Sequence, residues 1–372
     1  MINNKLSYLP NNIIYSTNEK VFWENKFQSK EHCLNYHGSL WLYYFFIECK
    51  KLGINFISSD IAVKNEFDCT NSLILQDGHS WHLKKLIKKG ALPNVLYCLE
   101  SPLFAYFFYD FRFLISKKFN HNILFLFNHK DFKNESQIYF PSYSITDEGY
   151  NLEWQKRKNI VLIAANKSAK SPIPNKFIDI IKWTYHFLYK KVSPSFKKSY
   201  LNQLHSKRFE VINFFGSIDK LDIYGRFWKE NNRYNKKEHL SIKPLIDRLN
   251  PEFCQNKELV LKDYKFAICF ENTAMPGYIT EKIIDCFLCG VIPIYLGAPN
   301  ITEVIPKKAF IDFRDFTTLE ELNEYIKNIN DTEAMDIINK GKEFLKSTDG
   351  FKFSYEFFAK NTLNLFLYGN NK

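Results

Sequence analysis

The chain has 372 residues, which is enough for two domains at about 150 residues each. Hydrophobic residues make up 45% and charged residues 24%, and this composition excludes a largely disordered chain. The formal net charge of +11 favours an anionic partner. The lysines occur in dispersed pairs, so charge alone does not choose among nucleotide phosphates, an anionic membrane surface and nucleic acid.

Targeting signals are not apparent in the sequence. Residues 1–20 contain no apolar signal-peptide core, and no apolar run approaches the roughly 18 residues that span a bilayer. The eight cysteines lie mostly in apolar contexts, which favours buried thiols in a reducing compartment. We therefore expect a cytoplasmic protein, with peripheral contact at the inner face of the membrane, through a basic and aromatic C-terminal tail, as an open alternative.

The N-terminal half begins with an α/β rhythm. A helix is predicted over 39–53, with Gly53 at its C-cap, and a short strand follows that ends at Asp60. Further strands are predicted over 94–100 and 121–128. Helix, glycine, apolar strand and acidic loop in this order are typical of an α/β domain.

A polar stretch over 139–157 is predicted to be a linker, because it carries turn formers and no sustained period. The elements predicted beyond it are a strand from 159, a helix over 199–215, a strand over 220–228, a helix over 241–249, a strand over 264–272, a helix over 280–290, and strands over 291–297 and 308–313. This alternation predicts a mostly parallel sheet. The predicted domains are 1–150 and 151–345, followed by a helical tail over 346–372.

Residues 270–282, FENTAMPGYITEK, gather polar chemistry at a junction between a strand and a helix. Ligands of parallel α/β sheets bind beyond the carboxyl ends of the strands, which is where Glu271 and Asn272 emerge. A Pro-Gly turn follows, and Thr280 is positioned to cap the next helix.

Glu281 and Lys282 then fall in the first helical turn, where free backbone N–H groups favour an anion. A carboxylate for ribose hydroxyls and a cation for phosphate are the parts of a nucleotide-sugar site. A capped helix with a surface Glu/Lys pair explains the same residues equally well. The Cys286-x-x-Cys289 pair lacks further metal ligands nearby, so we predict that it packs in the core.

The sequence of residues Tyr264–Phe316 closely resembles the donor-site signature of the α1,3/4-fucosyltransferases, which form glycosyltransferase family ten. The matching pattern is aromatic-Glu-Asn, then Gly-Tyr-x-Thr-Glu-Lys, then Pro-x-x-x-Gly-Ala. LDIYGRFW (221–228) and LYCLESP (96–102) resemble two weaker family elements. Resemblance before residue 90 is faint.

The resemblance implies a GT-B fold, with two Rossmann-like α/β domains whose mostly parallel sheets face a central cleft. The N-terminal domain would bind the acceptor and the C-terminal domain the donor. The implied activity is transfer of L-fucose from GDP-β-L-fucose, with inversion, to an N-acetylglucosamine-containing glycan of the lactosamine type. An α1,3 linkage and a lipopolysaccharide O-antigen are the expected details. No tightly bound cofactor is implied, and no metal, since such enzymes generally lack an Asp-x-Asp clamp.

Site residues follow from the matching motif positions. The residues implied to bind ribose, diphosphate and sugar are Asn272, Tyr278, Glu281 and Lys282. Arg208 matches the family arginine that contacts the diphosphate, with Lys170 as a competitor for that role. Arg226 is open between a diphosphate contact and packing. Glu271 is expected to support the loop without touching the donor.

Glu100 is the candidate catalytic base. It ends an apolar strand, where we expect partial burial to raise its pKa. A strand-terminal glutamate that accepts backbone N–H groups is the structural alternative, and Asp60 is a second candidate base.

Three other functions compete with fucosyl transfer. They are a GT-B enzyme with another sugar nucleotide, a basic nucleic-acid-binding protein, and an inactive lectin-like relative. The sequence carries no RNP, zinc-finger or helix-turn-helix signature, which disfavours nucleic acid. Every matched donor residue is present, which disfavours an inactive relative.

Overall fold

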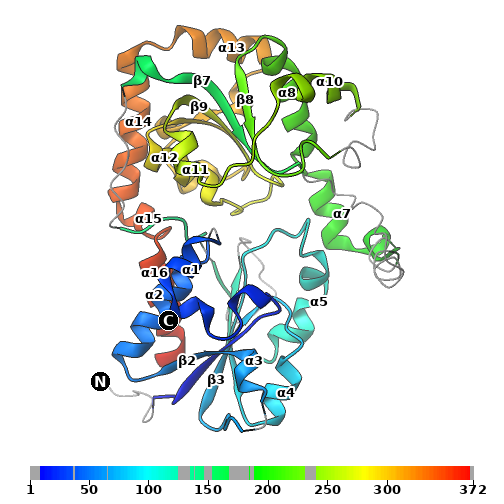
Figure 1. Cartoon of the computed structure of the whole chain (residues 1–372), viewed down its shortest axis with the longest axis vertical. Coiled ribbons are helices and arrows are strands. Elements are labelled where there is room, and N and C mark those ends of the chain that lie inside the picture. The colour runs from blue at the N-terminus through cyan, green and yellow to red at the C-terminus, as the bar shows by residue number, and fades with distance from the viewer. Residues whose placement is uncertain are drawn as a thin grey trace. The chain divides into compact units, whose positions relative to one another are not determined.

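The computed structural model describes the chain except residues 1–8, 37, 65, 125–134, 138, 146–152, 167–183, 185–187, 231–239 and 369–372. It forms two compact α/β units (Figure 1). Unit 1 comprises Met1–Glu100, Phe107–Ile145 and Phe351–Lys372, and unit 2 comprises Ser101–Tyr106 and Thr146–Gly350. The predicted boundary at 150/151 lies outside the described residues.

Unit 1 contains a six-stranded parallel sheet in the order β2-β1-β3-β4-β5-β6. The strands are β1 Asn12–Ser16, β2 Asn55–Ser58, β3 Ser72–Asp77, β4 Leu92–Cys98, β5 His121–Leu124 and β6 Glu135–Gln137. From β1 the chain passes to β2 on one side, and from β2 it crosses to β3 on the other side of β1. The topological switch point of the sheet therefore lies between β1 and β3. The predictions for β2, β4 and β5 are confirmed over these ranges, whereas β1 and β3 were not predicted.

Helices of unit 1 cover this sheet. They are α1 Lys30–Leu34, α2 Leu40–Lys51, α3 Ser59–Ala62, α4 Leu83–Lys88, α5 Tyr106–Ser116, which starts at the last residue of a unit 2 segment, and α16 Tyr355–Leu367. Figure 1 shows α2 and α16 side by side, and the ring of Trp41 lies 4.6 Å from that of Phe358. Trp41 also meets Tyr97 of β4 at 5.3 Å. The aromatic tail is therefore part of the core of unit 1.

Unit 2 contains a five-stranded parallel sheet in the order β11-β10-β9-β7-β8. The strands are β7 Lys158–Ile163, β8 Leu221–Tyr224, β9 Tyr264–Phe270, β10 Ile292–Leu296 and β11 Ile311–Asp312. The helices are α7 Pro194–Leu201, α8 His205–Ser217, α10 Lys243–Leu249, α11 Lys257–Leu261, α12 Glu281–Cys289, α13 Leu319–Asn328, α14 Asp331–Lys346 and α15 Thr348–Phe351, which runs to the first residue of the last unit 1 segment. The switch point of this five-stranded sheet lies between β7 and β9.

Short 3-10 turns complete the described elements: Lys20–Phe22, Lys26–Gln28, Trp154–Lys156, Ile301–Glu303, Lys307–Ala309 and Phe313–Asp315. The strand predicted over 308–313 is confirmed only at Ile311–Asp312, because 3-10 turns flank it on both sides. The strand predicted to end at Asp60 stops at Ser58, and Asp60 lies in the short helix α3.

The single helix predicted over 199–215 is wrong, because the chain breaks at 202–204 between α7 and α8. The amide of Leu204 donates to the carbonyl of Asn272 at 3.2 Å, and the carbonyl of Asn202 accepts from Ala274 at 2.7 Å. Backbone groups that would have closed a helical turn are instead paired with the loop after β9. This pairing starts α8 directly beside that loop.

Phe358→Ala is expected to destabilise unit 1 by about 3–5 kcal/mol, because it removes a buried ring between α2, α16 and β4. Chemical denaturation followed by circular dichroism measures the change. Tyr368→Ala, which removes a ring that is 52% exposed, is the matched control and should stay within about 0.5 kcal/mol of wild type. Equal effects of the two substitutions would contradict a core role for the tail.

Candidate functional site

The candidate site lies at the carboxyl edge of the unit 2 sheet, at the switch point between β7 and β9. The loop after β9 leads through a turn at Pro276 and Gly277 into α12. The amide of Tyr278 donates to the carbonyl of Met275 at 3.1 Å, and Gly277 has a φ of +78°, as a turn of this kind requires. The predicted turn is confirmed.

Glu271, the first residue after β9, is a fully buried carboxylate. It accepts hydrogen bonds from the amide of Thr280 at 2.8 Å, from the Thr280 hydroxyl at 2.8 Å and from Lys282 Nζ at 2.9 Å. Thr280 occupies the N-cap position of α12, but its side chain makes no cap hydrogen bond. The predicted side-chain cap is wrong, because the hydroxyl donates to Glu271 instead. These contacts support the expectation that Glu271 holds the loop, and the expectation that it does not touch the donor stays a prediction.

Lys282 brings a positive charge to the first turn of α12. Its Nζ also donates to the Thr280 hydroxyl at 2.7 Å, and its side chain is 21% exposed. Burial acts to lower the pKa of Lys282, but the Glu271 and Glu281 carboxylates outweigh it and raise the pKa above its ordinary value. The ammonium therefore stays charged beside the free N–H groups of the helix, an arrangement that favours an anion.

Arg208, on α8, reaches the same loop from the other side. Its NH2 group donates to the carbonyls of Phe270 and Glu271, the latter at 3.0 Å, and to Asn272 Oδ1 at 3.2 Å. Asn272 Nδ2 lies 3.5 Å from the hydroxyl of Tyr278, a long hydrogen bond. Burial lowers the pKa of Arg208 to about 10, and the guanidinium remains charged at neutral pH. Arg208, Asn272 and Tyr278 are thus one connected group.

Glu281 belongs to an ion-pair group that the sequence analysis missed. Lys257, at the start of α11, lies 3.3 Å from Glu281 Oε1 and 3.4 Å from Asp285 Oδ2. Burial, opposed by Lys257, raises the pKa of Asp285 to about 7. Burial acts to lower the pKa of Lys257, yet the two carboxylates outweigh it and raise that pKa. Lys257 therefore holds the carboxylate of Glu281 in place on the first turn of α12.

Three cations converge at this switch point. Arg208, Lys257 and Lys282 line one cavity of about 30 Å³ that also reaches Ala164, just after β7. This volume admits about one water, so the cavity itself holds no nucleotide. Its lining also includes Asp285, and it brings three cations, two of them paired with carboxylates, to the edge where a parallel sheet binds its ligands.

Within the described residues, no contact joins Arg226 to the group of Arg208, Lys257 and Lys282. Its guanidinium lies 5.0 Å from the ring centre of Phe253, and both line an open hollow of about 510 Å³ at the carboxyl end of β8. The contact with Phe253 supports a packing role for Arg226, and its contact with the diphosphate stays a prediction. Lys170 lies outside the described residues.

The two candidate bases lie in unit 1. Glu100 follows β4 and is exposed, so the expected partial burial is wrong. Both carboxylate oxygens of Asp60 lie 3.2 Å from the amide of Glu24, which gives that residue a structural contact. Asp60 also follows β2, the edge strand of the sheet, whereas Glu100 follows a central strand.

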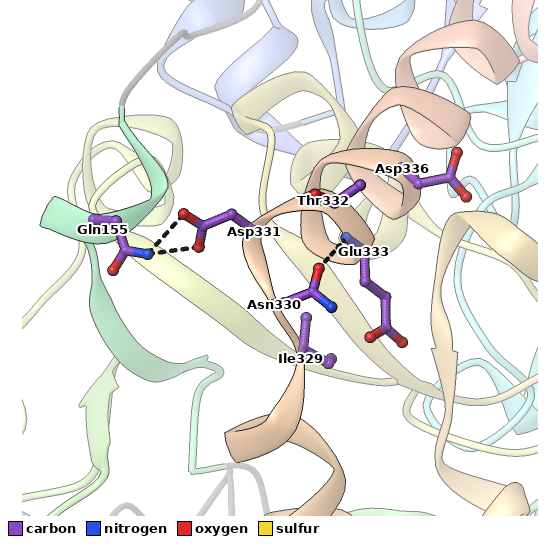
Figure 2. A pocket seen from close by; sticks show the side chains of 7 residues that line it. All are labelled: Gln155, Ile329, Asn330, Asp331, Thr332, Glu333 and Asp336. Carbon is purple, nitrogen blue, oxygen red and sulfur yellow. Dashed lines mark hydrogen bonds between the residues drawn. The ribbon is translucent and has the colours of Figure 1, made fainter.

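A wide hollow of about 910 Å³ lies elsewhere on unit 2 (Figure 2). Gln155 Nε2 donates there to both carboxylate oxygens of Asp331, at 2.6 and 2.8 Å, and Asn330 Oδ1 accepts from the amide of Glu333. Gln155 precedes β7, so this hollow lies at the amino edge of the sheet. It shares no residue with the motif.

The cysteines behave as core residues. Cys286 and Cys289 are fully buried, and Cys286 Sγ lies 3.2 Å from Cys269 Sγ with no disulfide. The prediction that the Cys-x-x-Cys pair packs in the core is confirmed. Within the described residues, no three His, Cys, Asp or Glu side chains gather as ligands for a metal ion.

Lys257→Met should destabilise unit 2 by about 2–4 kcal/mol, because Glu281 and Asp285 would face each other without their shared cation. Denaturant unfolding measures the loss. Lys308→Met removes an exposed lysine of the same unit and should change the free energy of unfolding by less than about 0.5 kcal/mol. Indistinguishable stabilities of the two variants would show that the ion pairs do not hold this site.

Comparison with known proteins shows that part of the chain is similar to a known family. Residues 196–336 match the model of "Glycosyltransferase family 10 (fucosyltransferase) C-term". The chain is 43% identical over 76 residues to the α-(1,3)-fucosyltransferase FucT of Helicobacter pylori, which is 20% of this chain and 16% of that enzyme. It is 34% identical over 99 residues to a mouse 4-galactosyl-N-acetylglucosaminide 3-α-L-fucosyltransferase, covering 25% of this chain and 28% of the relative.

A crystal structure of an α1,3-fucosyltransferase with GDP superimposes with a TM-score of 0.50 at 18% identity, covering 100% of this chain and 93% of that one. This likeness confirms the predicted GT-B fold of two parallel-sheet α/β domains. The sequence matches span only 16% and 28% of the curated relatives' lengths. Residues 196–336 are thus a match to the C-terminal domain of glycosyltransferase family 10, and the resemblance that the motif indicates is confirmed.

Proposed function

We propose that the chain is an inverting fucosyltransferase that transfers L-fucose from GDP-β-L-fucose to a glycan hydroxyl. The observation that carries the proposal is the linked group at the carboxyl edge of unit 2. There Arg208, Lys257 and Lys282 line one cavity, and Glu281 lies on the first turn of the adjoining helix. This group falls inside the segment that matches family 10.

The charges suit the departure of a diphosphate. The acceptor oxygen attacks C1 of fucose, the bond from C1 to the β-phosphate oxygen breaks, and GDP leaves with one additional negative charge. Lys282 and the N-terminus of α12 stabilise that charge electrostatically. Arg208 adds positive potential while it holds the loop. Glu281, oriented by Lys257, is the acceptor for the ribose hydroxyls. No bound cofactor is required by this scheme.

A base must take the acceptor proton, and we assign this role to Glu100. It follows a central strand of unit 1, and the chain passes into the unit 2 segment Ser101–Tyr106 directly after it. Glu100 is exposed. Asp60 fits the role less well, because it follows the edge strand β2 and its carboxylate accepts from the amide of Glu24.

The acceptor proposed is an N-acetylglucosamine-containing glycan with α1,3 linkage. It is supported by the name of the mouse relative. A lipopolysaccharide O-antigen is the proposed natural acceptor. Incubation with GDP-fucose and a panel of lactosamine-type sugars, with products analysed for mass and linkage, tests both details.

We also propose a cytoplasmic location, supported by eight cysteines that are all free thiols. None of the described helices is long and apolar enough to cross a bilayer. Membrane contact through the tail stays a prediction. The buried aromatic residues of α16 do not support it, because they serve the core of unit 1.

Nucleotide titration separates fucosyl transfer from a GT-B enzyme with another donor. GDP is expected to bind more tightly than UDP or ADP in isothermal titration calorimetry. Lys282→Met should weaken GDP binding by about 10- to 100-fold through the loss of a charge-assisted contact. Lys308→Met is the matched control. A preference for UDP would exclude GDP-fucose as donor, and tight salt-dependent binding of random DNA would revive the nucleic-acid alternative.

Glu100→Gln should lower kcat by about 10²- to 10⁴-fold, because the variant cannot accept the proton, while the Kd for GDP stays within about twofold. Asp60→Asn is the companion variant and should retain activity. Substantial turnover by the Glu100 variant would remove Glu100 from the role of base, and loss of activity only in the Asp60 variant would transfer the role to Asp60.

A further inference from the structure

Unit 1 has its own switch point, between β1 and β3, and a loop of unusual composition lies there. Ligands of open parallel sheets bind in the crevice at such a point. β3 ends at Asp77, and the loop continues through Gly78, His79 and Ser80 to Trp81. This loop is not part of the donor motif.

Hydrogen bonds hold the loop against the end of β1. The hydroxyls of Ser16 and Ser80 lie 2.8 Å apart, and both residues are buried. Asn18 Nδ2 donates to the carbonyl of His79 at 2.8 Å, and Asn18 Oδ1 accepts from the amide of Trp81 at 3.0 Å. The backbone at Trp81 is therefore fixed before any ligand arrives.

The side chain of Trp81 is 70% exposed on this fixed loop. Isolated exposed apolar residues are common, so exposure alone indicates nothing. A tryptophan whose backbone is anchored at a switch point is different, because no backbone freedom has to be lost when a ligand binds and only the side chain has to be ordered. The indole face carries partial negative charge, and the C–H face of a pyranose ring carries partial positive charge, so the two attract each other.

Asp77, the last residue of β3, places a carboxylate directly before this loop. Its Oδ2 lies 3.5 Å from the hydroxyl of Tyr15, which is itself 2.7 Å from the hydroxyl of Tyr97. Both tyrosines are buried, and Asp77 is half-buried. Among the described residues no lysine or arginine pairs with Asp77. Burial, with the charges of Glu19 and Glu100, raises the pKa of Asp77 to about 7.

A half-buried carboxylate without a cation is costly to the fold, and an apolar residue or an asparagine would avoid that cost. Its remaining hydrogen-bonding capacity suits the hydroxyls of a sugar. The neighbouring carboxylates of Glu19 and Glu100, whose charges act on Asp77, disfavour an anionic ligand at this edge. A neutral sugar satisfies both conditions.

We propose that Asp77 and Trp81 form a subsite for a neutral pyranose of the acceptor, with Asp77 accepting its hydroxyl hydrogen bonds and Trp81 packing on its C–H face. The subsite rests on the proposed fucosyl transfer and deepens it. It gives unit 1 a reason to prefer neutral acceptors over sialylated or phosphorylated ones.

The subsite should respond to pH through Asp77. Its carboxylate is faced by Tyr15 from β1, Tyr97 from β4, and the charges of Glu19 and Glu100. The pKa values of both tyrosines are raised well above their ordinary value by burial, so they stay neutral. As pH rises through about 7, Asp77 loses its proton and becomes the stronger acceptor, and the acceptor KM should fall.

Steady-state kinetics with GDP-fucose and a neutral lactosamine-type acceptor test the subsite. Trp81→Ala is expected to raise the acceptor KM about tenfold, and Trp81→Phe by no more than about threefold, with the GDP-fucose KM unchanged in both. Asp77→Asn should raise the acceptor KM above pH 7 and abolish its pH dependence. Tyr368→Ala, which truncates another exposed aromatic of unit 1, is the matched control. An unchanged acceptor KM in Trp81→Ala overturns the proposal.

Folding provides a second readout for Asp77. Because its pKa is higher in the folded chain than the ordinary value near 3.8, the stability it contributes is lost as pH rises through about 7. Asp77→Asn should therefore raise Tm at pH 8 and leave it nearly unchanged at pH 4. If Asp77→Asn is more stable and still has a higher acceptor KM, unfolding cannot explain the higher KM. A lower Tm of this variant at pH 8 would contradict the claim that the Asp77 carboxylate lacks a compensating cation.

A binding measurement separates this proposal from the proposed function. Saturation-transfer NMR with the neutral sugar, without donor, should give a signal for wild type that is lost in Trp81→Ala. Sugar binding without any fucosyl transfer would refute the proposed function and keep the subsite. If wild type transfers fucose but wild type and Trp81→Ala bind the sugar equally well, the proposed function stands and the subsite is refuted.

Discussion

The buried carboxylate of Glu271 is the constraint on which the donor side of the molecule depends. A buried charge is tolerated only when its hydrogen bonds are made, and Glu271 makes them with the amide and hydroxyl of Thr280 and with Lys282. These bonds tie the end of β9 to the start of α12. They also pair Lys282 with a carboxylate, so the N-terminus of α12 and Arg208 must supply part of the positive potential for an anion.

Local patterns predicted the parts of the fold that local chemistry determines. The strand before Glu271, the turn at Gly277 and the helix that follows were all evident, because apolar runs, a Pro-Gly pair and a first-turn carboxylate act within a few residues. The break at 202–204 was not evident, because its backbone partners lie about 70 residues away in the chain. Lys257 was missed for the same reason, since its two carboxylates belong to a different helix.

The two sheets share one design. Each is parallel, and each has polar residues at the carboxyl ends of its strands near a switch point. The charges differ between them. Arg208, Lys257 and Lys282 bring cations to this edge of unit 2, where Glu271, Glu281 and Asp285 offset part of their charge, whereas Asp77 and Glu100 make that of unit 1 negative. This division matches a phosphate-bearing donor on one unit and a neutral hydroxyl acceptor on the other.

The packing of α16 on α2 has a consequence for synthesis of the chain. Every strand of unit 2 lies between residues 158 and 312, so its sheet can close while the ribosome is still extending the chain. Unit 1 lacks a core helix until residues 355–367 have emerged, although its own strands are made first. Domains usually complete their folding from the N-terminus onward. Unit 1 therefore gains the packing of α16 only after residues 355–367 have been made, although its strands precede those of unit 2.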